Sequence, residues 1–207
     1  ISIRGDFQPI QCTTNQPILT TRGWIHAQEL TTSDRVCIPR LNNHTKDITL
    51  HEVEKDKNFL WLLGLYIAEG VLGTRKYEGK NKSHATNGTG GGSGMIQFCL
   101  HSNEKELHNK IIDIGKRLFD TNFGVSFRKS SQSATVHGYN VWLRDLLEEL
   151  GGKYSDKKKL ADRLMFLQPE LQLSIVKGWL DGDGCYTRQR IITGVSTSEI
   201  WARQVRT

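Results

Sequence analysis

Two acidic residues stand at equivalent places in two separate segments of this 207-residue chain. Glu69 follows the apolar run 59–68, and Asp183 follows the related stretch 173–182. A shift of 114 residues superposes the two segments, since 183 − 69 = 114. Two carboxylates that meet repel one another unless they are protonated or share a cation. Such oxygen ligands suit Mg²⁺, which can activate water for phosphodiester hydrolysis, so these two residues are the candidate catalytic and metal-binding pair.

Small residues precede both acids at matching positions. The same shift places Gly64 on Gly178 and Ala68 on Gly182. If both segments are helices, residues this small allow the two helix axes to approach unusually closely. Side-by-side helices related by a pseudo-twofold axis would then bring the two acidic residues together at their C-terminal ends.

A second interpretation is that each acid only caps or solvates the exposed end of a helix. A carboxylate at a helix C-terminus is unfavourable for the helix dipole, however, so its recurrence at equivalent positions favours a functional role. Asp181 corresponds to Ile67 in the first copy and therefore lacks this recurrence. We interpret Asp181 as structural.

The residues after each acid repeat in outline. The first copy predicts a strand at 95–100 and a helix beginning near 101–104, and the second predicts a strand at 190–195 and a helix beginning near 196–200. The first copy then continues with strands at 125–129 and 134–137 and a helix at 141–150. We expect an α+β fold with two related repeats, the second incomplete at residue 207.

Composition limits the possible partners. Lys and Arg number 28 against 22 Asp and Glu, a formal net charge of +6, which favours a polyanionic partner. The four cysteines are widely spaced, so neither a disulfide framework nor a zinc finger is expected. No run is long and apolar enough to span a bilayer. We expect an intracellular, cytoplasmic protein with no membrane contact.

The segments 62–70 and 176–184 resemble the two LAGLIDADG motifs of homing endonucleases. The resemblance implies αββαββα repeats about a pseudo-dyad, with a curved antiparallel sheet lying on double-stranded DNA. It also implies that Glu69 and Asp183 are Mg²⁺ ligands that share two or more ions. The endonuclease domain would cover residues 52–207, with a first repeat at about 56–152 and a second, incomplete repeat at about 170–207. A pseudo-twofold chain of this kind would act as a monomer.

The expected DNA contacts are basic. The segment 73–94 is rich in glycine and lysine and is interpreted either as a flexible surface loop or as a mobile hairpin tip that follows a phosphate backbone. The candidate DNA-binding residues are Arg75, Lys76, Lys80, Lys82, Arg128, Lys129, Arg188 and Arg190.

A lysine between the two motifs is a further catalytic candidate. Residues 157–161 resemble the family's Lys-x-Ile-Pro segment, with Ala161 where proline is usual. Lys158 could offset negative charge that develops during cleavage. Alternatively, Lys157 to Lys159 form a solvated basic run.

The N-terminal residues have a different character. Short apolar stretches broken by turn formers predict a small all-β segment at 1–45. Residues 12–25 resemble a conserved block of intein Hint domains, in which a Thr-x-x-His pair assists protein splicing. Thr13 matches this block, but Gln16 takes the histidine position and cannot act as a general acid or base. Neither Ile1 nor Thr207 supplies a splice-junction residue, so we expect an interior fragment or a degenerate element.

Three functional hypotheses follow. The first is an intein-encoded homing endonuclease that makes a site-specific, Mg²⁺-dependent double-strand cut, with the host protein that the intein interrupts as a second partner. The second is protein splicing by the parent protein. The third is a degenerate LAGLIDADG scaffold that binds DNA or RNA without cleavage.

Overall fold

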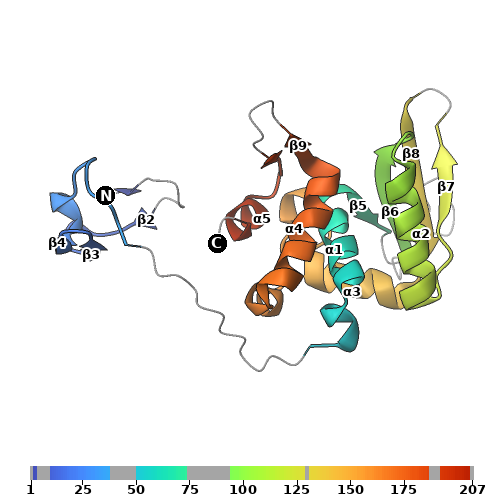
Figure 1. Cartoon of the computed structure of the whole chain (residues 1–207), viewed down its shortest axis with the longest axis horizontal. Helices are drawn as coiled ribbons and strands as arrows, with labels where there is room; N and C mark the ends of the chain where they lie inside the picture. Colours follow the sequence, from blue (N-terminus) through green and yellow to red (C-terminus); the bar gives the residue numbers. More distant parts are fainter. Residues whose placement is uncertain are drawn as a thin grey trace, which may run out of the picture. The chain divides into compact units, whose positions relative to one another are not determined.

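The structure is a computed structural model that describes residues 2–3, 10–37, 50–73, 94–128, 131–186 and 192–205. Helices and small antiparallel sheets make it an α+β chain. It divides into two compact units, one of residues 1–44 with 206–207 and one of residues 45–205 (Figure 1). In the described part of the chain, no helix is long and apolar enough to cross a membrane.

The N-terminal unit is built from short strands. Strand β1 (Ser2–Ile3) pairs with β2 (Ile10–Gln11), and β3 (Pro17–Thr20) pairs with β4 (Gly23–His26), which leads into the 3-10 helix η1 (Ala27–Glu29). All these pairings are antiparallel. The described residues of this unit thus form short antiparallel strands and one 3-10 helix.

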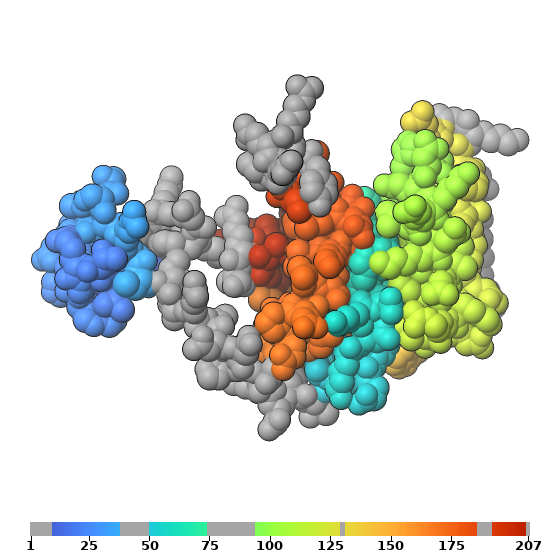
Figure 2. All heavy atoms as spheres, viewed as in Figure 1, coloured from blue at the N-terminus to red at the C-terminus, as the bar shows by residue number. Residues whose placement is uncertain are grey.

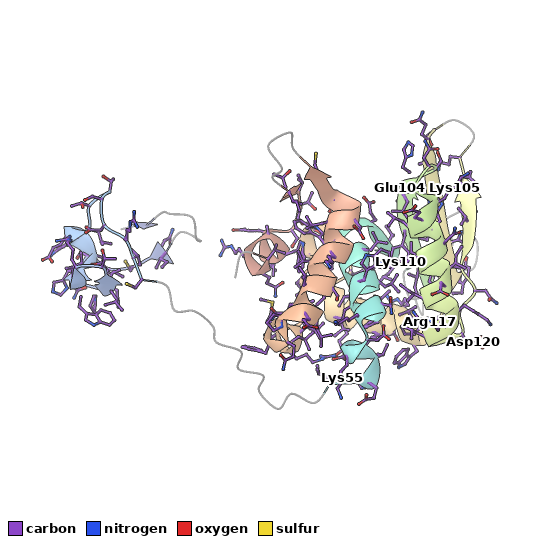
Figure 3. All side chains as sticks on the ribbon, viewed as in Figure 1. Lys55, Glu104, Lys105, Lys110, Arg117 and Asp120 are labelled. Carbon is purple, nitrogen blue, oxygen red and sulfur yellow. The ribbon has the colours of Figure 1, made fainter. Side chains whose placement is uncertain are left out.

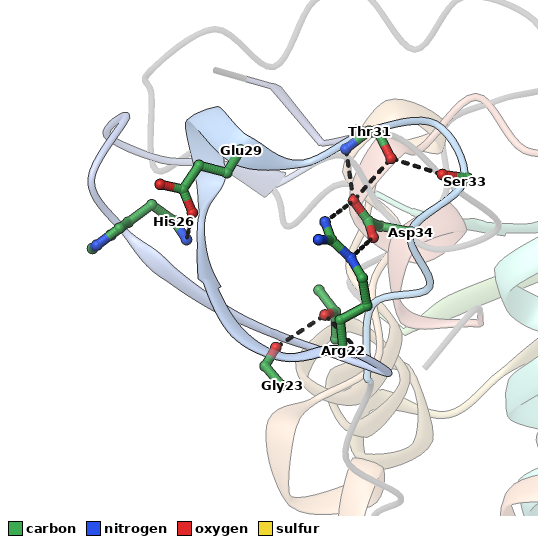
Figure 4. A network of polar contacts seen from close by, with 8 residues as sticks. Arg22, Gly23, His26, Glu29, Thr31, Ser33 and Asp34 are labelled. Carbon is green, nitrogen blue, oxygen red and sulfur yellow. Dashed lines mark hydrogen bonds and ion pairs between the residues drawn. The ribbon is translucent and has the colours of Figure 1, made fainter.

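An ion pair links two segments of this unit. Arg22, at the tip of the β3–β4 hairpin, donates to both carboxylate oxygens of Asp34 at 2.6 and 2.8 Å (Figure 4). Asp34 also accepts from the backbone N–H of Thr31 at 2.7 Å. The bidentate contact holds the pKa of Asp34 well below its usual range and ties the hairpin tip to the segment that follows it.

The larger unit contains the predicted helices and strands. Its helices are η2 (Glu52–Lys55), α1 (Lys57–Glu69), α2 (Lys105–Phe119), α3 (Val141–Gly151), η3 (Ser155–Lys157), η4 (Asp162–Phe166), α4 (Pro169–Asp183) and α5 (Glu199–Gln204). Its strands are β5 (Gly70–Leu72), β6 (Met95–His101), β7 (Gly124–Phe127), β8 (Ser133–Tyr139), β9 (Gly184–Tyr186) and β10 (Ile192–Gly194). Both apolar segments are thus helices, each of which ends on its acidic residue.

Helix α1 is the centre of the core. Asp56 caps its first turn by accepting from the N–H groups of Asn58 and Phe59 at 2.7 and 3.1 Å. Every residue from 59 to 67 is buried, because α2, α3, α4 and the sheet surround the helix. In the space-filling view α4 (orange) lies directly against α1 (cyan), and α2 (green) lies on the other side (Figure 2).

The main sheet has one covered and one open face. Its four antiparallel strands run in the order β5-β6-β8-β7. Along β6 and β8, buried apolar residues alternate with polar ones, as a sheet packed on one side requires. The covered face carries Ile96, Phe98, Leu100, Ala134 and Val136, and the open face carries Gln97, Cys99, His101, Ser133, Thr135 and His137.

The second copy of the motif repeats the start of the first. α1 continues without a break into β5, which pairs with β6, and α4 continues in the same way into β9, which pairs with β10. A helix follows each hairpin, α2 in the first copy and α5 in the second. The sequence repeat is therefore also a structural repeat.

Candidate functional site

The helices α1 and α4 touch through their glycines. A Cβ atom added to Gly64 would overlap the carbonyl oxygen of Ile175, and one added to Gly178 would overlap the carbonyl oxygen of Trp61. Trp61 and Ile175 are themselves related by the shift, since 175 − 61 = 114. The contact is thus reciprocal, as a twofold relationship between the two helices requires. This confirms the close approach predicted from the small residues.

The same contact brings the acidic ends together. A Cβ atom added to Gly182 would lie 2.6 Å from the Cβ of Ala68 and 3.0 Å from the Cγ of Glu69. The side chain of Glu69 therefore lies over the backbone of α4, beside the residue that precedes Asp183. Both acidic side chains are half-buried.

Burial raises the pKa of both acids, and repulsion by Asp183 adds to the shift of Glu69. Burial, followed by the negative charges of Asp183 and Glu104, raises the pKa of Glu69 to about 7. Burial also raises the pKa of Asp183. Two carboxylates in such a place are unfavourable when both are ionised, so a bound proton or cation stabilises the pair. Such a perturbed pair at the end of two packed helices is a candidate functional site.

Two residues near Glu69 were not recognised from the sequence. Glu104, at the start of α2 (Figure 3), adds negative charge near Glu69 while it accepts from the backbone N–H of His101 at 2.6 Å. Cys99 lies on the open face of β6, and burial together with the charge of Glu69 raises the pKa of its thiol. Glu104 resembles an ordinary helix-start residue in the sequence, so only the fold reveals its proximity to the pair.

The donor set fits a hard cation that keeps part of its water shell. Within the described ranges, no group of three or more His, Cys, Asp or Glu side chains is arranged to hold a metal ion. The pair consists of two carboxylates, and Mg²⁺ is commonly bound by one or two carboxylates, several waters and substrate phosphates. Glu69 and Asp183 would hold it.

The predicted catalytic lysine is buried beneath the site. Lys158 is 3% exposed, and its Nζ donates to the carbonyl oxygens of Tyr66 and Gly70 at 2.9 and 3.0 Å. Burial lowers the pKa of Lys158 to about 7. Its neighbours Lys157 and Lys159 are exposed, so the interpretation of the whole run as solvated is wrong at its central residue.

Asp181 has a structural partner. Its Oδ2 accepts from the indole N–H of Trp61 at 2.6 Å, across the contact between α4 and α1. The ammonium of Lys110, which projects from α2 (Figure 3), lies 3.6 Å from the centre of the Trp61 ring. This hydrogen bond across the helix contact is consistent with the interpretation of Asp181 as a structural residue.

One of the predicted DNA-binding residues lies in the described chain. Arg128 is exposed directly after β7, at the edge of the main sheet, where its charge partly offsets the effect of Glu69 on Cys99. The remaining seven lie outside the described residues; they are Arg75, Lys76, Lys80, Lys82, Lys129, Arg188 and Arg190.

The splicing-block remnant forms a turn in the N-terminal unit. Thr13 and Gln16 are exposed, and the N–H of Gln16 donates to the carbonyl of Thr13 at 3.3 Å. The carbonyl of Gln16 accepts from the N–H of Ala27 at 2.8 Å. His26 is also exposed, and its Nδ1 bonds to the carbonyl oxygen of Asn15 at 2.9 Å.

Comparison with known proteins gives partial matches. The chain is 28% identical over 168 residues to a replication factor C small subunit of Methanocaldococcus jannaschii, covering 74% of this chain and 8% of that protein. It is also 28% identical over 188 residues to an iron–sulfur cluster assembly SufBD family protein of Mycobacterium tuberculosis, covering 88% of this chain and 20% of that protein. The chain therefore spans a fifth or less of the length of these curated relatives. No family model matches it.

The carboxyl pair lies next to a polar sheet surface. Its two carboxylates emerge where α1 passes into β5 and α4 passes into β9, so each acid is joined directly to a sheet strand. Through β5 and β6 the first of these sheets presents a polar face. A polyanion that lay on this face would pass close to the carboxyl pair.

Proposed function

We propose that the chain is part of a LAGLIDADG homing endonuclease carried within an intein, and that it makes a Mg²⁺-dependent double-strand cut in DNA. The observation that carries this proposal is the reciprocal packing of Gly64 and Gly178, which brings Glu69 and Asp183 together at the ends of two related helices. A helix pair that only stabilised the core would have no need for repelling carboxylates at its paired ends.

In this scheme Glu69 and Asp183 bind Mg²⁺ and orient it. Each side chain would ligate Mg²⁺ through carboxylate oxygens, and the twofold relationship presents one acid to each DNA strand. Bound Mg²⁺ supplies Lewis-acid chemistry, because it lowers the pKa of a ligated water and stabilises the leaving oxygen. Because burial and repulsion raise the pKa of Glu69 to about 7, protons compete with the cation for this site at neutral pH.

The open face of the main sheet is the surface proposed to lie on DNA. It carries hydrogen-bonding side chains, including Gln97, Thr135 and His137, and Arg128 lies at its edge. Polar side chains on such a surface can contact base edges, while cationic ones neutralise phosphates. The net charge of +6 supports a polyanionic partner.

The comparisons support an inserted element. The two relatives bear names that denote different tasks, and the aligned segment covers 8% of one and 20% of the other. A segment that matches two differently named proteins, and is much shorter than either, fits a module inserted into different hosts. The host of this chain would be its second partner. Splicing itself has weaker support, because Gln16 takes the place of the histidine that would assist it.

Plasmid cleavage by the full-length parent protein tests this proposal. The substrate carries the uninterrupted insertion site, and the reaction contains Mg²⁺. We expect the parent protein to linearise this plasmid, and we expect Glu69→Gln and Asp183→Asn each to abolish cleavage while DNA binding in EDTA is retained. Asp181→Asn is the matched control, because it makes the same change on the same helix at a residue bonded to Trp61. It should cut at the wild-type rate.

Two outcomes would contradict the proposal. Cleavage by the Glu69→Gln/Asp183→Asn double variant at the wild-type rate would show that the pair is not the catalytic site. DNA or RNA binding by the parent protein without any cutting, at every Mg²⁺ concentration tested, would instead favour the scaffold that binds nucleic acid without cleavage.

A further inference from the structure

The end of α1 is held by a side chain from a distant part of the sequence. The backbone N–H of Gly70, the C-cap of α1, already donates to the carbonyl of Tyr66. The Nζ of Lys158 bonds to two carbonyls here, that of Tyr66 in the last turn of α1 and that of Gly70 at the start of β5. These two residues lie on either side of Glu69 in the chain. One ammonium group therefore clamps the backbone segment that carries the Glu69 carboxylate.

The surroundings of this ammonium are unusual for a surface lysine. Its Nζ lies 3.2 Å from the centre of the Tyr66 ring, and the hydroxyl of Tyr66 donates to the carbonyl of Gly152. Among the described residues, Lys158 forms no ion pair with a carboxylate. The buried charge is stabilised by two carbonyl dipoles and an aromatic face, all of which belong to α1 or the residue that follows it.

The second repeat anchors this lysine. Ser198, the fully buried N-cap of α5, donates its hydroxyl to the carbonyl of Lys158. Two residues later, Leu160 exchanges two hydrogen bonds with the side chain of Gln204 in α5, at 2.7 and 2.8 Å. The segment 158–160 is thus fixed on both sides. Helix α5 of the second repeat therefore fixes Lys158, and Lys158 in turn bonds to the end of α1 that carries Glu69.

The hydrogen bonds of Lys158 indicate that it orients Glu69 and does not neutralise the Glu69 carboxylate. The bonds of Lys158 go to the main chain on both sides of Glu69 and not to its carboxylate. We propose that Lys158 is a positioning residue, which sets the direction in which the Glu69 carboxylate leaves α1 and thereby the affinity of the pair for Mg²⁺.

This inference rests on the proposed function, in which Glu69 is a Mg²⁺ ligand. It differs from a catalytic role in one measurable respect. A group that acts on the reacting atoms changes the cleavage rate at saturating Mg²⁺ and leaves metal affinity unchanged. A group that orients a ligand changes the affinity for the metal, typically about 10- to 100-fold for an outer-shell partner.

Calorimetric Mg²⁺ titration of the full-length parent protein, without DNA, is the primary test. Lys158→Met keeps the length and shape of the side chain but removes its donors. We expect it to weaken Mg²⁺ binding about 10-fold or more and to recover near-wild-type cleavage when Mg²⁺ is raised to saturation. Lys159→Met, at the exposed neighbouring position, is the matched control and should bind Mg²⁺ like the wild type.

A second variant guards against misfolding of Lys158→Met, which far-ultraviolet circular dichroism would reveal. Ser198→Ala leaves the ammonium in place but removes the hydrogen bond that anchors the Lys158 carbonyl. It should weaken Mg²⁺ binding in the same direction, about threefold. Unchanged Mg²⁺ affinity in both variants overturns the inference.

The other outcomes separate the two proposals. Lys158→Met with normal Mg²⁺ affinity but slow cleavage at saturating Mg²⁺ would make Lys158 catalytic, which overturns positioning and leaves the proposed function intact. If Glu69→Gln also leaves Mg²⁺ affinity unchanged, the proposed function itself fails, and the inference about Lys158 fails with it.

Discussion

Gly64 and Gly178 each lie against the main chain of the opposite helix, and the two contacts are related by the same 114-residue shift that relates the two residues. A pair of helices this close leaves no room for side chains at the crossing. The two sequence repeats are therefore related by approximate twofold symmetry at the helix crossing. Because each helix ends on its acidic residue, this symmetry also places Glu69 and Asp183 near one another.

Substitution of Gly178 tests the close contact between α1 and α4. Gly178→Ala places a methyl group onto the carbonyl oxygen of Trp61, so α1 and α4 must separate. We expect a loss of about 2 to 3 kcal/mol in the free energy of unfolding, despite the better helix propensity of alanine. Urea denaturation of the chain measures it. Lys177→Ala, at the preceding exposed position, should change stability by about 0.5 kcal/mol or less. Equal effects of the two substitutions would refute the close contact.

Exchanging the residue types of Ala68 and Gly182 tests the helix contact next to the two acids. Gly182→Ala alone would crowd the Cβ of Ala68, which lies 2.6 Å from the added atom, and should cost about 1 to 2 kcal/mol. Adding Ala68→Gly moves the methyl group from one helix to the other, and the helix propensities of the two changes cancel. We expect the double variant to recover at least half of the loss. Simple additivity of the two single variants would exclude direct contact between these positions.

The pH dependence of stability follows from the raised carboxyl pKa. In metal-free protein the folded state retains the Glu69 proton up to about pH 7, whereas the ordinary pKa is 4.5. The folded state thus binds more protons in this window, so stability falls as pH rises from about 4.5 to 7. The lowered pKa of Lys158 acts in the opposite direction, because it makes stability rise with pH between about 7 and 10.5.

Thermal unfolding in EDTA at pH 5, 6 and 7 measures this effect. Asp183→Asn removes one repelling charge from Glu69 and should reduce the fall in melting temperature across this range. Asp181→Asn, whose side chain faces Trp61, should leave the fall unchanged. Identical slopes for the wild type and Asp183→Asn would show that the two carboxyl groups do not interact.

The parts of the fold with strong local patterns were predictable. The run 59–68 is apolar almost all round, which predicts a buried helix or a buried strand, and the structure forms it as the helix α1, which ends at Glu69. The strands β6 and β8 and the helices α2 and α3 also lie where their periodicity places them. The strands β5 and β9 were missed, because three residues are too few to show an alternating pattern.

Burial of charged residues was not predictable. Lys158 is the middle of three consecutive lysines, and nothing local separates it from its exposed neighbours. Its bonding partners are carbonyls about 90 positions earlier in the chain, which come within its reach only in the assembled fold. Glu54 is a similar case, because its fully buried carboxylate is matched by Arg163, at 2.9 and 3.0 Å, from a separate 3-10 helix. Such pairings depend on the assembled fold.

A Mg²⁺ titration of the parent protein, followed by carbon-13 NMR of its labelled carboxyl groups, tests whether Glu69 and Asp183 form one cation site. We predict that the side-chain carboxyl signals of both residues move with a single common dissociation constant, and that Asp183→Asn weakens the response of Glu69. The Asp181 signal should stay unchanged. A response at only one of the two acids, or at neither, would show that they do not share a cation.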